Sequence, residues 1–137
     1  MNETGRLRWV WVVIIVAAAY LVSGLVSAAL SRAAASAQGR EAWRLTAWII
    51  SAIAFAAHIR YEYVRLRSTP RTTAFHVALA VGLAGFGLAV SASIHGHATN
   101  HPFPASALLI WPVMTALPAF VVALVVAVVL SRPRRNI

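Results

Sequence analysis

The chain has 137 residues, of which 61% are hydrophobic and only 11% are charged, and its mean hydropathy is +0.77. A soluble domain carries about a quarter charged residues, so this composition is typical of a membrane protein and leaves no room for a soluble catalytic module. The net charge of +9 comes from arginines that flank apolar runs instead of lining one face, which argues against nucleic acid as a partner. The absence of cysteine excludes disulfides and thiol catalysis.

Four apolar runs predict four transmembrane helices, because each is long enough to cross a hydrocarbon core of about 30 Å. They cover about residues 9–30, 43–66, 74–94 and 105–130. We therefore expect an all-α fold, a four-helix transmembrane bundle that forms a single domain over residues 1–137. The first run has a second interpretation, since basic residues, an apolar core and A-A-A-S-A ending at Ala37 also resemble a cleaved signal peptide.

The connections between these runs are read from their polar residues and prolines. Residues 31–44 predict a polar linker, and Pro70 is expected to stop the second helix because proline lacks the amide donor. Residues 93–104 predict a turn from their glycine, asparagine and prolines. Pro112 and Pro118 lie inside the fourth run, where kinks are expected.

The arginines predict the orientation of the bundle. With the N-terminus inside, nine arginines lie in inner segments and three lie in outer ones, which is a clear positive-inside bias. Both termini and the segment 60–71 are therefore expected in the cytoplasm. The arginine-only basic set and the alanine-rich runs suggest a GC-rich genome, and so a multi-pass protein of the bacterial inner membrane.

The third run predicts a face for close helix packing. Small residues recur along it at steps of four, three, four and four, which places them on one side of a helix. Such a face lets two backbones approach closely in a bilayer. Its members are Ala78, Gly82, Gly85, Ala89 and Ser93.

A first candidate site is a histidine group in the predicted outer turn, with His95, His97 and His101 within seven residues. Three neutral imidazoles with an open position would suit zinc, copper or nickel. No carboxylate or thiolate accompanies them. Two other interpretations stay open, a solvated polar turn and a pH-sensing loop.

A second candidate site lies near the predicted inner face. His58 and Glu62 share a helical face, and antiparallel pairing of the second and third helices could bring His76 beside them. Two imidazoles could clamp a haem, or could hold a metal together with Glu62. The alternative is structural: Glu62 offsets Arg60 and Arg65, and His58 hydrogen-bonds a group on a neighbouring helix.

In histidine placement alone, the chain resembles di-haem b-type membrane cytochromes. The resemblance implies haem b near the inner face on His58 and His76, and a second haem near the outer face on His95 or His101. No sequence motif of that family accompanies the histidines.

Two function classes follow from these patterns. The first is a non-enzymatic membrane protein that acts through helix contacts, as a homo-oligomer or as a subunit or partner of a larger membrane assembly; the missing catalytic set favours it, since the chain has no aspartate for a Ser-His-Asp triad. The alternative is a metal- or haem-binding protein that uses histidines in transport or electron transfer.

Overall fold

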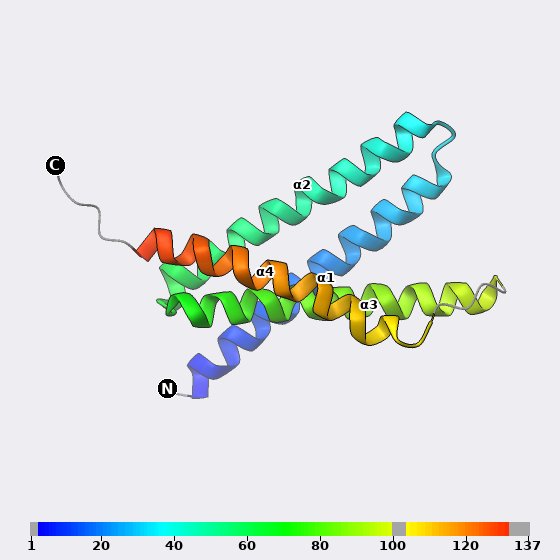
Figure 1. Ribbon diagram of the computed structural model, residues 1–137. Helices are drawn as coiled ribbons and strands as arrows, with labels where there is room; N and C mark the ends of the chain where they lie inside the picture. Colours follow the sequence, from blue (N-terminus) through cyan, green and yellow to red (C-terminus); the bar gives the residue numbers. More distant parts are fainter. Residues whose placement is uncertain (1–2, 100–103, 132–137) are drawn as a thin grey trace.

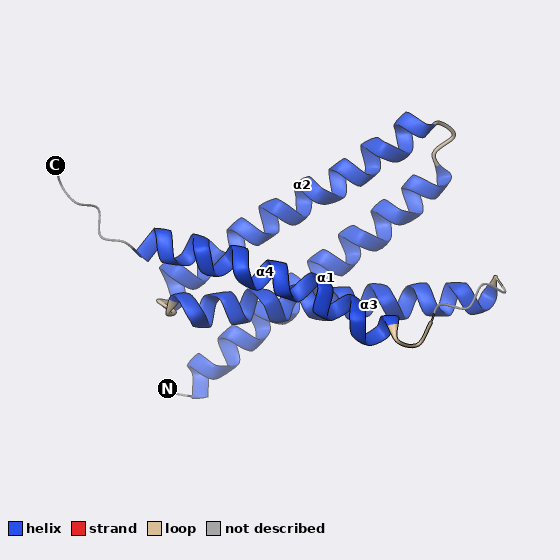
Figure 2. Cartoon of the chain, in the orientation of Figure 1, coloured by secondary structure: helices blue, strands red, loops and turns tan. Residues whose placement is uncertain are grey.

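The computed structural model describes residues 3–99 and 104–131 of the chain. This part is all-helical, which confirms the predicted all-α class (Figures 1 and 2). The elements are α1 (Glu3–Ala33), α2 (Ala37–Tyr61), the π-helical segment η1 (Glu62–Leu66), α3 (Pro70–Ala98) and α4 (Ala107–Ser131). Four helical stretches, with η1 continuing α2, are long and apolar enough to cross a membrane.

The predicted linker over residues 31–44 is wrong in length, because only residues 34–36 lie outside a helix. Ser36 explains the early start of α2: its backbone is extended and its hydroxyl accepts a hydrogen bond from the amide of Gly39 at 3.0 Å. This bond caps the helix by satisfying a free amide of the first turn. Gln38, Gly39 and Arg40, which belong to the predicted polar linker, therefore lie in the first turn of α2.

The proline at position 70 starts α3 instead of stopping the helix before it. The preceding helical segment ends at Leu66, and its C-cap Arg67 adopts the left-handed conformation with a φ of 49°. Thr69 then caps α3 by accepting a hydrogen bond from the amide of Thr72. Pro70 occupies the first turn, where its missing amide leaves no carbonyl without a donor.

The predicted turn over residues 93–104 is wrong in its first half, because α3 continues to Ala98. A glycine such as Gly96 destabilises a helix by only about 1 kcal/mol relative to alanine, which is too little to end a helix as long as α3. Thr99 ends α3 by donating its amide to the carbonyl of His95 at 3.1 Å. Residues 100–103, including His101, lie outside the described part.

The chain folds as two helical hairpins, α1–α2 and α3–α4 (Figure 1). The α3–α4 contact is the most extensive, α1 packs on both α2 and α3, and α2 makes few contacts with α3. The hairpins meet where α2 turns into α3 and diverge toward their far ends, as Figure 1 shows. We call the meeting place the clasp end and the opposite end the open end.

The buried apolar side chains gather in two clusters toward the clasp end. One cluster joins α2, α3 and α4 through Ile59, Ala74, Val77 and Ala123. The other joins α1 and α3 through Val13, Ala17 and Ala80. Most of these residues are small, so the helices approach closely there.

The small-residue face of α3 lies against α4. A Cβ added to Gly82 would come within 3.3 Å of the Cβ of Ala116, and one added to Gly85 would come within 2.6 Å of Oγ1 of Thr115. Ala78 and Ala89 are buried as well. The neighbour of this face is therefore a helix of the same chain.

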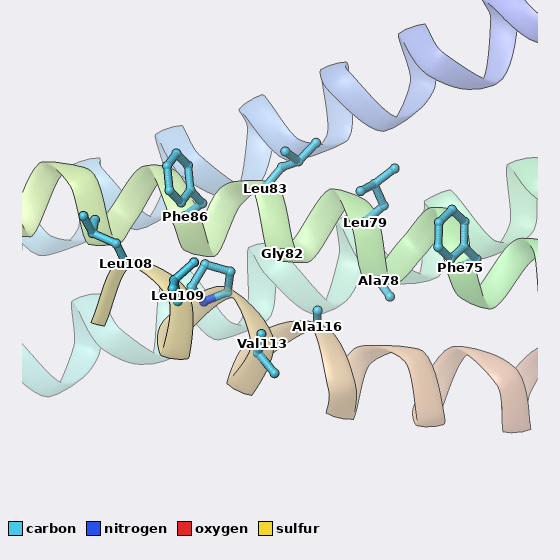
Figure 3. Close-up of a pocket in the computed structure, with 11 residues that line it drawn as sticks. Phe75, Ala78, Leu79, Gly82, Leu83, Phe86, Leu108, Leu109, Val113 and Ala116 are labelled. Atoms are coloured by element: carbon cyan, nitrogen blue, oxygen red, sulfur yellow. The ribbon is translucent and has the colours of Figure 1, made fainter. Parts of the chain in front are cut away.

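Beside this contact runs an apolar groove of about 460 Å³ (Figure 3). Phe75, Leu79, Leu83 and Phe86 border it from α3, and Leu109 faces them from α4. All of its lining side chains are apolar, so the groove offers no hydrogen-bonding or ionisable group for chemistry.

Candidate functional site: a buried glutamate–histidine clasp

A fully buried carboxylate lies at the clasp end. Glu62 has no exposed surface, and both of its oxygens are engaged. Oε2 accepts a hydrogen bond of 2.6 Å from the hydroxyl of Ser68, and Oε1 lies 2.9 Å from Nδ1 of His76. An ionised carboxylate can only accept, so Nδ1 of His76 is the donor in this second bond.

The local backbone brings these groups together. Glu62 is the first residue of η1, and π-helical segments of this kind occur often at functional sites. The left-handed Arg67 then reverses the chain, and the amide of Ser68 donates to the carbonyl of Glu62 at 3.2 Å. The side chain of Ser68 is thereby held against the carboxylate, while α3 starts close enough for His76 to reach it.

An aromatic ring from α1 completes the arrangement. The indole of Trp9 stacks on the imidazole of His76, with ring centroids 4.4 Å apart and planes 2° from parallel. A stack of this kind adds about 0.5–1.5 kcal/mol beyond the area that it buries. The glutamate, the histidine and the tryptophan therefore join α1, α2 and α3 at one point.

A second histidine lies on the other side of the carboxylate. His58 is one helical turn before Glu62 and is only 2% exposed. Its Nε2 lies 3.8 Å from Oε1 of Glu62, too far for a hydrogen bond. Neither ring nitrogen has a hydrogen-bond partner within the described residues, which is unusual for a buried polar group.

The fourth helix is tied to the same end. The hydroxyl of Tyr63 in η1 donates to the carbonyl of Leu130 in the last turn of α4, at 3.0 Å. All four helices thus meet around the α2–α3 connection. We refer to the central group as the clasp, and its members are Trp9, His58, Glu62, Ser68 and His76.

The structure brings together His58, Glu62 and His76, the three residues of the second candidate site. The expected partners of the carboxylate are wrong, however, because Arg60 and Arg65 are exposed and histidines take their place. Nor does His58 make the hydrogen bond to a neighbouring helix that the structural alternative expected, at least within residues 3–99 and 104–131.

The haem and metal interpretations of this site gain no geometric support. The two imidazoles converge on one carboxylate oxygen instead of facing each other across a haem-wide gap, and an indole lies flat on one of them. Across residues 3–99 and 104–131, no group of three or more His, Cys, Asp or Glu side chains is arranged to hold a metal ion.

The described histidines of the first candidate site do not converge. His95 and His97 lie in the last turn of α3 and are exposed. Residues two apart on a helix point to different sides, so these imidazoles do not share a face. The predicted outer turn is therefore helical at both His95 and His97.

Sequence reasoning missed two members of the clasp. They are Trp9 and Ser68, which the spacing of the histidines and the carboxylate does not indicate. The arrangement can tie helices together and can hold a proton among one carboxylate and two imidazoles. No protein-family model, curated protein or solved structure matches the chain.

Proposed function

We propose that this protein is a small non-enzymatic integral membrane protein that acts through helix contacts, as a subunit or partner of a larger membrane assembly. The observation that carries the proposal is an open face of α3 beyond the clasp. Gly87, Ser91, His95 and Ala98 recur there at steps of four, four and three. With Val90 and Ile94 they line a groove of about 410 Å³.

This face begins where α1 leaves α3. A Cβ added to Gly87 would come within 2.9 Å of the side chain of Leu21, so α1 still covers this position. Ser91 is only half-buried and His95 is exposed. The groove therefore opens where the two hairpins diverge.

A transmembrane helix of a partner suits such a face better than lipid does. Small residues let a second backbone approach, and Ser91 and His95 can hydrogen-bond to a helix but not to an acyl chain. We infer that the occupant is a helix of another membrane protein or of a second copy of this chain. The clasp then serves to hold the hairpins at the angle that leaves the face open.

The proposed orientation places the clasp end and both chain termini in the cytoplasm of a bacterial inner membrane. The positive-inside distribution of nine arginines against three supports it. The occupied groove would then lie toward the outer side of the bilayer.

Photocrosslinking in native membranes tests the proposal. Ile94 in the groove and Ile53 on α2 are matched controls for each other, since they are 67% and 64% exposed. A photoreactive phenylalanine analogue at position 94 should give a discrete protein adduct, whereas the same group at position 53 should react mainly with lipid. Mass spectrometry of the adduct separates a second copy from another protein. Equal adducts at both positions, or none at position 94, would contradict the proposal.

A further inference from the structure

Four buried polar atoms have no hydrogen-bond partner within the described residues. They are the hydroxyl oxygens of Tyr20 and Ser23 on α1 and the two ring nitrogens of His58 on α2. A buried polar group without a partner costs about 1–3 kcal/mol, and ordered water is the usual remedy in protein interiors. Close packing of the helices does not account for these four atoms, because it buries them without supplying a hydrogen-bond partner.

The clasp indicates the level of His58 in the bundle. Glu62 on α2 contacts His76 on α3, and the two helices are antiparallel. His58 is one helical turn from Glu62 toward the open end, and Ala80 is one turn from His76 in the same direction. His58 and Ala80 therefore lie at about the same level along the bundle. Tyr20 packs on the cluster that contains Ala17 and Ala80, from a backbone position nearer the open end, since its neighbour Leu21 meets Gly87.

The side chains of Tyr20 and His58 lean toward each other. Side chains on a helix tilt toward its N-terminus, and α1 and α2 run in opposite directions. The phenol of Tyr20 therefore leans toward the clasp end, and the imidazole of His58 leans toward the open end. Both carry polar atoms that lack partners within the described residues, so water between them would find a hydrogen-bonding group on each helix.

From Tyr20, further hydroxyl groups follow one another along α1 toward the α1–α2 turn. Tyr20, Ser23, Ser27 and Ser31 recur at steps of three, four and four, which places them on one face. Ser27 and Ser31 are buried, and the hydroxyl of Ser31 donates to the carbonyl of Arg40 at 3.4 Å beside the α1–α2 turn. From Ser31 to Tyr20 the helix rises about 16 Å, so the hydroxyl line extends from that turn to the middle of α1, and the phenol of Tyr20 leans from there toward the clasp end.

We propose that the seam between α1 and α2 holds a file of water and conducts protons between the two ends of the bundle. The substrate is the proton, and a proton gradient drives its movement. At the clasp end a proton binds Oε1 of Glu62; once a side-chain movement closes the 3.8 Å gap to Nε2 of His58, this O–H bond breaks as an N–H bond forms at Nε2. Nδ1 of His58 then releases its proton to water, and Tyr20 and Ser23 pass a proton onward. Rotation of the imidazole resets the relay.

Proton flux into liposomes tests this proposal, independently of any partner helix. The purified full-length chain is reconstituted with a pH-sensitive dye inside, and a potassium gradient with valinomycin sets the potential. We expect acidification faster than in protein-free vesicles. Glu62→Gln should lower the protein-dependent rate by about a hundredfold, at the low end of what a positioned proton-transfer group contributes. Tyr20→Phe, which removes one hydroxyl, should lower it severalfold.

Tyr61→Phe is the matched control, because Tyr61 is 38% exposed and lies outside the proposed line. It should conduct like the parent chain. Tyr20→Phe keeps the aromatic ring, so it remains informative if Glu62→Gln fails to fold. A parent chain that is no faster than protein-free vesicles would overturn the proposal. A Tyr20→Phe variant that conducts at the parent rate would overturn it too.

Discussion

The two ends of the bundle are held by different means. At the clasp end, the Glu62 carboxylate, the His76 imidazole and the Trp9 indole join three helices, and Tyr63 adds the fourth. Toward the open end, the hydroxyl of Ser31 bonds to the carbonyl of Arg40, and this bond joins α1 to α2 within one hairpin. One end therefore joins the two hairpins, and the other lets them separate.

This difference shows what determines helix arrangement in such an apolar chain. If the helices lie in a bilayer, apolar side chains gain little by leaving lipid for another helix, so they do not select one neighbour strongly. A buried carboxylate has far fewer acceptable surroundings, because it needs donors on both oxygens. A few polar residues at one end can thus fix an arrangement that the many apolar residues leave open.

The largest expected effect comes from removing the carboxylate. Glu62→Ala leaves the buried His76 and the half-buried Ser68 without their acceptor, and breaking a buried pair in this way costs about 3–5 kcal/mol. Reversible unfolding in mixed micelles measures the change in the free energy of unfolding. Glu41→Ala is the matched control, since Glu41 is exposed near the open end. Equal losses from the two variants would show that the clasp end is not special.

A smaller effect is expected where α3 and α4 touch. Gly85→Ala places a Cβ against Oγ1 of Thr115, which is held by hydrogen bonds to two backbone carbonyls of α4. Overpacking of this kind costs about 1–3 kcal/mol in the free energy of unfolding. At Gly87 the Cβ would meet only the flexible tip of Leu21, so Gly87→Ala should cost less.

A second substitution checks the cause of the Gly85 effect. Thr115→Ala combined with Gly85→Ala removes the atom that the new Cβ meets. The double variant should recover part of the lost stability in the same unfolding measurement. If the two losses simply add, the contact between these positions is not the cause.

The smallest effect is expected from the ring that covers the clasp. Trp9→Leu keeps an apolar side chain but removes the stack on His76, which should lower the free energy of unfolding by about 1 kcal/mol. Trp11→Leu, at a position 61% exposed, should change it little. Loss of stability from Trp11→Leu alone would mean that the stack does not help to close the clasp end.

The sequence was sufficient for the four helices but not for their ends. Long apolar runs predict spans directly, whereas a cap depends on one hydroxyl. Ser36 and Thr69 each supply such a hydroxyl, and each starts its helix earlier than the apolar runs do. At the end of α3, Gly96 costs the helix too little free energy to end it, so the turn expected from residue 93 onward starts later.

The site was predictable in part for a similar reason. The step from His58 to Glu62 is a helical repeat, and antiparallel pairing brings His76 near, so periodicity indicates all three residues. The choice of histidine over arginine as the partner depends on depth. Long arginine side chains reach water from the end of a span, whereas a short imidazole on the inner side of α3 remains beside the carboxylate. Nothing in the local pattern distinguishes Trp9 from Trp11.

The hydrogen bonds of the clasp join residues that are close to one another in the sequence. Ser68 is six residues and His76 is fourteen residues from Glu62. These bonds can form during synthesis as soon as the first two turns of α3 have left the ribosome, before α4 exists. The α2–α3 corner can therefore form first, and the last helix can dock onto it without having to select its neighbour.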